Sequence, residues 1–191
     1  MQIRIAALSL IVLLGLMGCS NPTTSTTTQP EQIKIINEPT IKPGDSVPAP
    51  SGEVILSLQG AIGQSNVDGR LDFDMTTLEQ IGLIEFSVDD PHIGKRITYQ
   101  GVPISALLAV AQVSNSAAEI DARALNDYEA TLQIQAIKDW PVIIATKRDG
   151  ERMSIVDKGP LEIVFPYGIY PINPDEFNNL WVWQLRALEI R

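Results

Sequence analysis

Residues 97 to 108 read Ile97-Thr98-Tyr99-Gln100-Gly101-Val102-Pro103-Ile104-Ser105-Ala106-Leu107-Leu108, a strand pattern that runs into a helix pattern. The alternation of side chains up to Tyr99 predicts a half-buried strand. Pro103 then stands near the first turn of a helix, where its missing N–H costs nothing. The apolar residues at 104, 107, 108 and 111 share one face of that helix. We expect Gly101 to take a positive φ just before it.

Strand patterns lie on both sides of this junction. They predict strands at Val54–Leu58, Leu71–Asp74, Ile84–Val88, Glu119–Leu125, Ala130–Gln135, Val142–Lys147, Leu161–Phe165 and Leu180–Ile190. A short helix is expected to have Thr76 or Thr77 as its N-cap, with Glu79 or Gln80 available to close a capping box. Asp149-Gly150 predicts a hairpin turn, because both residues tolerate positive φ. Many strands and few short helices indicate an α+β fold with a mixed or antiparallel sheet.

Composition limits the classes of function. The 191 residues are 45% hydrophobic and 19% charged, which supports a single core of ordinary size. The formal net charge of -9 argues against nucleic acid as a partner, because such binding depends on cationic side chains. One cysteine excludes a disulfide framework, and one histidine disfavours a His-rich metal centre or a Ser/His/Asp triad.

The amino terminus indicates export and anchoring. Arg4 precedes the apolar run Ile5–Leu16, which is too short to span a hydrocarbon core of about 30 Å. The run ends in Leu16-Met17-Gly18-Cys19, which resembles the lipobox of bacterial lipoproteins. That resemblance implies a signal peptide over residues 1–18 and an acylated Cys19 that binds membrane lipid. It also implies location in the cell envelope, on the periplasmic face of the outer membrane in a cell with two membranes. The alternative is an ordinary signal peptide with an incidental cysteine.

Residues 19–52 are expected to form a disordered tether. The segment is rich in Thr, Pro, Gln, Ser and Asn. It offers too little apolar side chain to offset a backbone ordering cost of roughly 1–2 kcal/mol per residue. The alternative is a short strand containing Ile33, Ile35 and Ile36 that docks on the domain. Residues 53–191 then form a single module.

Five segments of residues 53–191 occur in the order of a known family. They are Ile97–Leu108, Leu125–Ala130, Val142–Ala145, Gly159–Pro166 and Asn179–Ile190. Together they resemble the oxidoreductase molybdopterin-binding domain, which has the sulfite-oxidase-type fold. Tyr99-Gln100-Gly101-Val102-Pro103 matches that family's aromatic-x-G-V-P signature. The resemblance implies a β-rich fold with molybdopterin as its cofactor.

The chain departs from the family at the metal ligand. Active members bind molybdenum through a cysteine thiolate between the strand after the first helix and the G-V-P signature. The corresponding residues, Ser87–Lys95, contain no cysteine, and Cys19 would be acylated at the far end of the tether. Soft thiolate ligation is therefore not available. We predict no cofactor, no metal site and no catalytic residue, and molybdopterin stays open only through the family resemblance.

Five residues are candidates for lining a pocket where the family holds its cofactor: Asp89, Asp90, His92, Tyr167 and Tyr170. Neighbouring carboxylates usually point apart, so a turn is favoured over a cation site at the first three. The two tyrosines lie in a stiff Pro-rich loop, which fits a binding surface and a plain connector equally well.

The tryptophans raise a similar choice. Trp140, Trp181 and Trp183 offer a stacking platform for a sugar or an aromatic ligand. Trp181 and Trp183 share one face of the expected last strand, and core packing is the interpretation that we favour.

These observations predict a membrane-anchored extracytoplasmic lipoprotein. Its domain is expected to be a non-redox binding, sensory or accessory module, with a protein or small molecule as its partner. Two alternatives stay open: a genuine molybdopterin-dependent oxidoreductase without cysteine ligation, and a lipoprotein that binds a small ligand.

Overall fold

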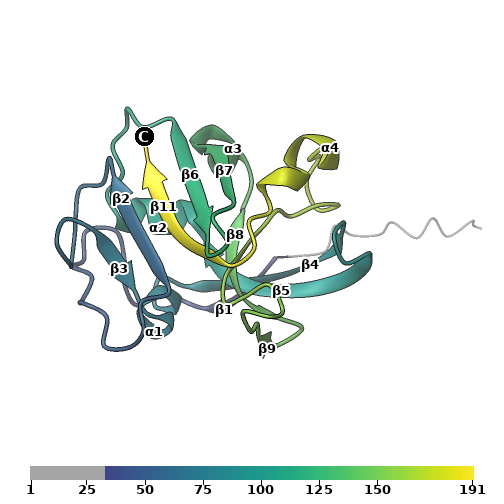
Figure 1. Ribbon diagram of the computed structural model, residues 1–191, viewed down its shortest axis with the longest axis horizontal. Coiled ribbons are helices and arrows are strands. Elements are labelled where there is room, and N and C mark those ends of the chain that lie inside the picture. The colour runs from purple at the N-terminus through teal and green to yellow at the C-terminus, as the bar shows by residue number, and fades with distance from the viewer. Residues whose placement is uncertain (1–32) are drawn as a thin grey trace, which may run out of the picture.

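In the computed structural model, which describes residues 33–191, two β-sheets share one hydrophobic core (Figure 1). The first sheet has the order β1-β4-β5-β8-β10, with β9 paired to β8 and every pair antiparallel. Its strands are β1 (Lys34–Asn37), β4 (Leu83–Asp90), β5 (Lys95–Pro103), β8 (Ile143–Arg148), β9 (Glu151–Arg152) and β10 (Glu162–Val164).

The second sheet has the order β3-β2-β11-β6-β7. Its strands are β2 (Leu56–Gly60), β3 (Leu71–Phe73), β6 (Glu119–Ala124), β7 (Glu129–Gln133) and β11 (Leu185–Ile190). Only β2 and β11 pair in parallel within this sheet. The helices are α1 (Met75–Glu79), α2 (Ile104–Val110), α3 (Ile134–Asp139) and α4 (Pro174–Phe177), followed by the 3-10 helix η1 (Asn178–Leu180). The fold is therefore α+β with sheets that are mostly antiparallel, as the sequence predicts.

The junction between β5 and α2 forms as expected, but Gly101 acts differently from the prediction. Its φ is not positive, so the expectation of a left-handed conformation is wrong. Gly101 instead lies where β8 approaches most closely, and a Cβ there would be 2.3 Å from the carbonyl oxygen of Ile144. The absent side chain therefore lets the two strands pair.

Helix α1 is capped by a residue other than the predicted ones. Asp74 is the N-cap, and its Oδ1 accepts from the backbone N–H of Thr77 at 2.8 Å. Its Oδ2 accepts from the N–H groups of Ser51 and Gly52, both at 2.9 Å. Thr76 is therefore not the cap, and Glu79 closes no capping box. Asp74 joins the helix start to the segment that precedes β2.

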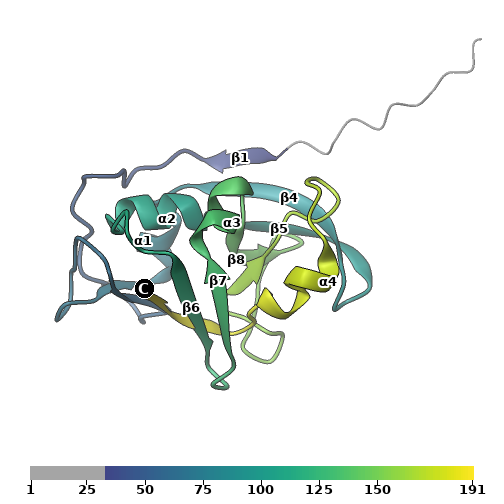
Figure 2. The ribbon, with the colours of Figure 1, turned by 90° about the horizontal axis from the view of Figure 1, so that it is seen from above.

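Residues 33–52 pack on the module. Strand β1 pairs with β4 at the outer edge of the first sheet, as Figure 2 shows. Ile41 and Val47 are buried in the core, and the N–H of Ile41 donates to the carbonyl of Gln80 at 2.9 Å. The prediction of disorder for residues 19–52 is therefore wrong over residues 33–52. The alternative, a short strand docked on the domain, is the one that the structure has. The signal peptide and Cys19 lie outside the described residues.

The last predicted strand is shorter than expected, and the helices α3, α4 and η1 were not predicted. Residues 178–180 form η1 and Trp181–Trp183 precede β11, which begins only at Leu185. The pattern expected as strand up to Gln135 ends at Gln133, and α3 follows. The Asp149-Gly150 turn is confirmed, with φ of 48° and 85° at its two residues. No helix within residues 33–191 combines the length and the apolar character that a membrane span requires.

Candidate functional site

A hollow of about 270 Å³ lies where three segments from different parts of the chain meet. The β4–β5 turn contributes His92, and the β6–β7 turn contributes Asn126 and Tyr128. The segment from η1 towards β11 contributes the rest of the lining, which is Asn178, Asn179, Trp181 and Trp183. We call these seven residues the aromatic hollow. Its lining carries four rings and three amides.

The β4–β5 turn owes its shape to Asp90. This carboxylate is 2% exposed, and its Oδ1 accepts from the backbone N–H groups of His92 at 2.7 Å and Ile93 at 2.8 Å. Its Oδ2 accepts from the hydroxyl of Tyr99 at 2.5 Å. Asp90 is thus fully engaged in holding the turn that presents His92.

His92 connects the turn to the opposite wall. Its Nε2 lies 3.2 Å from the backbone carbonyl oxygen of Asn178, which accepts a hydrogen bond from the ring. The imidazole meets the Trp183 ring edge to face, with centroids 4.9 Å apart and an interplanar angle of 86°. Trp181 is 5.6 Å away at 57°. Tyr128 closes the third side, where its hydroxyl donates to the Asn179 carbonyl at 2.6 Å.

Several buried polar atoms around the hollow have no hydrogen-bond partner. These atoms are the Oδ1 of Asn178 and the Nε1 of both Trp181 and Trp183. The indole of Trp181 lies near the Tyr167 hydroxyl, yet neither reaches hydrogen-bond geometry. In the described part of the chain, the remaining atoms of this kind belong to one ion pair, Arg148 with Glu162. Unpartnered buried polar atoms are rare in folded proteins and cost about 1–3 kcal/mol each. Because these atoms have almost no solvent-exposed surface, they lie within the packing around the hollow and not on its open surface.

A charged cluster lies next to Trp183, which forms a β-bridge with the buried Glu162. Arg148 Nη2 contacts Glu162 Oε2 at 2.8 Å, and the guanidinium lies 5.8 Å from the centroid of the Tyr99 ring. Burial raises the pKa of Glu162 to about 7, against the attraction of Arg148. Lys158 covers the ring of Trp183, with its Nζ 3.5 Å from the ring centroid. Lys158 thus contacts a residue of the hollow, because Trp183 belongs to its lining.

The five predicted pocket residues do not come together. Only His92 lines the hollow. Asp89 is exposed and contacts Arg96 at 3.4 Å, while Asp90 points inward, so the two carboxylates diverge as expected. Within residues 33–191, no three His, Cys, Asp or Glu side chains are grouped to hold a metal ion.

The two predicted tyrosines are corrected as pocket residues. Tyr167 is a core residue, 6% exposed, that stacks on Phe165 and lies against Trp181. Burial raises the pKa of the Tyr167 hydroxyl to about 12. Tyr170 is half-buried beyond a turn in which its N–H donates to the Pro166 carbonyl, and it does not line the hollow. Neither tyrosine of the Pro-rich loop therefore lines the aromatic hollow.

Sequence reasoning found part of the lining and missed the amides. Of the tryptophans that could form a stacking platform, Trp181 is 3% exposed and packs in the core, whereas Trp183 is only half-buried. Trp140 packs against Phe177 instead. Four lining residues were missed as site residues: Asn126, Tyr128, Asn178 and Asn179. The signal for the last two was their place just before the aromatic pair.

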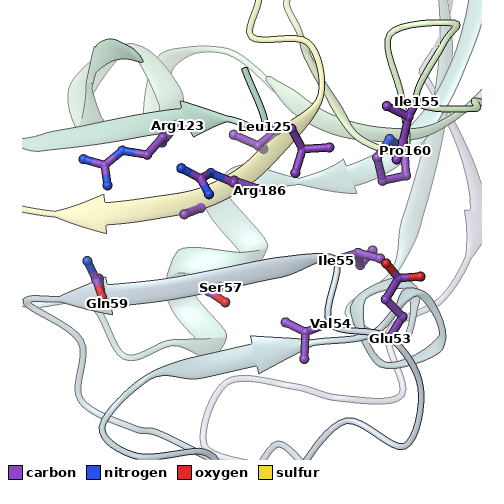
Figure 3. Close-up of a pocket in the computed structure, with 12 residues that line it drawn as sticks. Glu53, Val54, Ile55, Ser57, Gln59, Arg123, Leu125, Ile155, Pro160 and Arg186 are labelled. Carbon is purple, nitrogen blue, oxygen red and sulfur yellow. The ribbon is translucent and has the colours of Figure 1, made fainter. Parts of the chain in front are cut away.

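A larger groove of about 460 Å³ lies on the second sheet, beside β2, β6 and β11 (Figure 3). Val54, Leu125 and Ile155 give it an apolar lining. Two arginines reach it, and both are already paired: Arg123 with Glu129 and Arg186 with Asp127. None of its lining residues carries an unpartnered buried polar atom. We therefore take the smaller aromatic hollow as the candidate site.

Comparison with known proteins supports the fold and nothing finer. No protein-family model matches the chain, and a search of curated proteins found no match. Among solved structures, the chain is similar to the sulfane dehydrogenase SoxCD from Paracoccus pantotrophus, with a TM-score of 0.55 and 18% sequence identity. The match covers 71% of this chain and 37% of that one. This likeness supports the sulfite-oxidase-type fold expected from the sequence.

The residues present do not fit thiolate-bound molybdenum. Along Ser87–Lys95, where the resembled family has its ligand cysteine, every polar side chain ends in oxygen or nitrogen. The Ser87 hydroxyl is engaged with that of Thr98 at 2.8 Å, and Asp90 already has three donors. The donor set is hard, whereas the family's protein ligand is soft. These side chains therefore do not support a reaction at molybdenum of the kind that the family performs.

Proposed function

We propose that this chain is a non-redox binding module on a sulfite-oxidase-type scaffold, with the aromatic hollow as its ligand site. The module serves as a sensory or accessory component, and its scaffold derives from the oxidoreductase molybdopterin-binding domain family. Small-molecule sites are typically lined by aromatic groups together with a few placed polar groups, as this hollow is.

One observation carries the proposal. The hollow brings together His92, Tyr128 and Trp183 from three separate segments of the chain and sets amide side chains beside their rings. This mixture of aromatic and polar groups on one concave surface is what a small-molecule site requires. The larger groove has no comparable cluster of rings, and both of its arginines are already paired.

The proposal extends to the cell envelope on grounds of sequence alone. The lipobox-like Leu16-Met17-Gly18-Cys19 supports cleavage after residue 18 and acylation of Cys19. Two or three acyl chains give durable anchoring, because each buried methylene contributes about 0.8 kcal/mol. The hollow would then be presented outside the cytoplasm, close to the membrane that the acyl chains hold.

Thermal unfolding with a panel of compounds tests the binding role. The panel contains neutral hexoses, short carboxylic acids and purines, because a compound that binds only the native state raises its melting temperature. We expect at least one class to raise the melting temperature of the wild type and to lose that effect in Trp183→Ala. If no class does so, the binding role is wrong.

Elemental analysis tests the non-redox role. The protein is purified from a host that makes molybdopterin, and its molybdenum content is measured beside that of Asp90→Asn. We expect a trace content in both proteins. A near-stoichiometric molybdenum content in the wild type would establish the rival oxidoreductase and overturn the non-redox proposal.

A further inference from the structure

We infer that the larger groove on the second sheet binds an alkyl carboxylate, a small amphiphile with an apolar tail and an anionic head. This groove shares no lining residue with the aromatic hollow, so the inference goes beyond the proposed function. Three features support it: the apolar groups at one end, the hydrogen-bond donors towards the other end, and the charge of the lining.

Two small side chains form the floor of the groove. Ser57 on β2 and Ala187 on β11 are partners in the parallel register of these strands, and both line the groove. Directly paired residues point to the same face of a sheet, so their small size leaves that face open. The volume of about 460 Å³ lies within the range of about 300–1,000 Å³ that is typical of small-molecule sites.

One end of the groove is lined by apolar side chains that solvent reaches. Val54, Leu125 and Ile155 are 46%, 44% and 56% exposed. Seven large apolar side chains are exposed among residues 33–191, and these three of them line one concave surface. Exposed apolar residues scattered singly are ordinary, whereas a contiguous group marks a surface that binds apolar partners. This end therefore suits an alkyl tail.

The loop that presents Ile155 is fixed by hydrogen bonds. The side-chain amide of Gln184 donates to the Ile155 carbonyl at 2.8 Å, and the N–H of Gly159 donates to the Ser154 carbonyl at 2.7 Å. The Ser154 hydroxyl donates to Asp157 Oδ2 at 2.6 Å. The apolar end is thus preformed, so a ligand has little of the protein to order when it binds.

Donors for an anionic head lie towards the other end. Figure 3 shows Gln59 and Arg123 at the end away from Ile155, with Arg186 between the two ends. Within residues 33–191, the side chains of Ser57 and Gln59 make no hydrogen bond to another residue. A hydroxyl, an amide and two guanidinium groups therefore offer donors to the two oxygens of a carboxylate.

Both arginines keep donors for a ligand although each has an ion-pair partner. Arg123 contacts Glu129 through Nε, and Arg186 contacts Asp127 through Nη2. A guanidinium has five N–H donors, so others remain on each side chain. The four side chains of these pairs are 42% to 83% exposed. Ion pairs so exposed to water contribute little to stability, so a ligand carboxylate can compete for them.

The charge of the lining favours an anionic head and orients it. The lining holds two arginines and one glutamate, a formal charge of +1 in a chain whose net charge is -9. The glutamate, Glu53, lies at the apolar end in Figure 3, where it repels a carboxylate. The head is therefore directed towards Gln59 and Arg123, and the tail towards Val54 and Ile155.

Isothermal titration of the purified full-length protein with matched probes tests the inference. Octanoate, octanol and octylammonium share one tail and differ in the head, and acetate has the head without the tail. Octanoate should bind tightest, and acetate should not bind measurably. From hexanoate through octanoate to decanoate, the affinity should rise about two- to fourfold per methylene, which is the effect of burying most or all of it.

Two pairs of variants locate the site. Ile155→Ser should weaken octanoate binding about three- to tenfold. Val156→Ser is its control, because Val156 is 93% exposed but does not line the groove, and it should leave the affinity unchanged. Arg186→Gln should weaken the binding of octanoate about three- to tenfold and leave that of octanol unchanged. Arg191→Gln is its control, because Arg191 is also exposed and ion-paired but lies outside the lining.

The outcomes separate this inference from the proposed function. Trp183→Ala, which alters the aromatic hollow, should not change octanoate binding. Absence of octanoate and decanoate binding would overturn the inference, while the hollow keeps its own test by thermal unfolding. Equal affinity for the three heads would overturn the anionic head. Octanoate binding that neither Ile155→Ser nor Arg186→Gln weakens would overturn the groove as the site.

Discussion

Replacing Gly101 by alanine tests whether the close approach of β5 and β8 depends on the missing side chain. The added Cβ would lie 2.3 Å from the Ile144 carbonyl oxygen and 2.7 Å from the Ala145 Cα. Ordinary contact begins at 3.4 Å, so one strand must move by about 1.1 Å. Gly101 is buried and also pairs with Ile84 on β4, so neither neighbour can simply yield. Overpacking typically costs about 1–3 kcal/mol, and this backbone shift belongs at the upper end, about 3 kcal/mol.

Urea unfolding followed by tryptophan fluorescence measures this loss. With a slope of about 1–3 kcal/mol per molar urea, the midpoint for Gly101→Ala should fall by about 1–3 M. Gly52→Ala is the control, because its Cβ would meet nothing closer than 3.6 Å and its φ is not positive. The control should change stability by no more than about 0.5 kcal/mol. A Gly101→Ala protein as stable as the wild type would refute the role assigned to the close approach.

Three further predictions concern groups away from that junction. Burial raises the pKa of Glu162 to about 7, above its unfolded value of 4.5. The stability that the protonated side chain contributes is therefore fully present below pH 4.5 and is lost as pH rises through 7. The stability of the wild type relative to Glu162→Gln should therefore fall between about pH 5 and pH 8 in urea titrations, and a constant difference would contradict this. Asp74→Ala removes the N-cap of α1 and should lower the free energy of unfolding by about 1–2 kcal/mol. The N–H donor of Thr77 first, and then those of Ser51 and Gly52, hold the pKa of Asp74 below its usual range, so its contribution is lost as pH falls through that lowered pKa. An unchanged melting temperature at neutral pH would count against the cap. Cys19→Ser should leave the full-length protein uncleaved or soluble, and membrane fractionation identical to that of the wild type would contradict the lipid anchor.

The parts of the fold that the sequence predicts are those set by local chemistry. The strand-to-helix junction at Pro103 follows from side-chain alternation and from the fixed φ of proline, and the Asp149-Gly150 turn follows from tolerance of positive φ. Glu79 shows where local reasoning fails. Its carboxylate binds Arg152, 73 residues away, and Thr146, 67 residues away, rather than capping its own helix. No local sequence pattern predicts contacts between residues so far apart in the chain.

The candidate site was predicted only in part for a similar reason. His92 was correctly placed in a polar turn, but whether Asp90 pointed outward or inward depended on Tyr99, a residue on the next strand. The alternation of Trp181, Val182 and Trp183 is typical of a strand. The chain nevertheless enters β11 only after Gln184, which has a φ of 52°. That local reversal turns Trp183 towards the β4–β5 turn instead of continuing the sheet.

Two neighbouring places in this fold differ in whether their polar groups have hydrogen-bond partners. Where the resembled family has its metal ligand, Ser87 and Asp90 are hydrogen-bonded within the protein, so that position needs no added group. At the adjacent hollow, Asn178 and Trp183 remain unpartnered at a cost of about 1–3 kcal/mol each. Folded proteins have only about 5–15 kcal/mol of net stability, so such a cost is a substantial fraction of the total. Because these atoms have almost no solvent-exposed surface, a ligand reaches them only if the lining moves, so a hydrogen bond to either residue requires a local rearrangement.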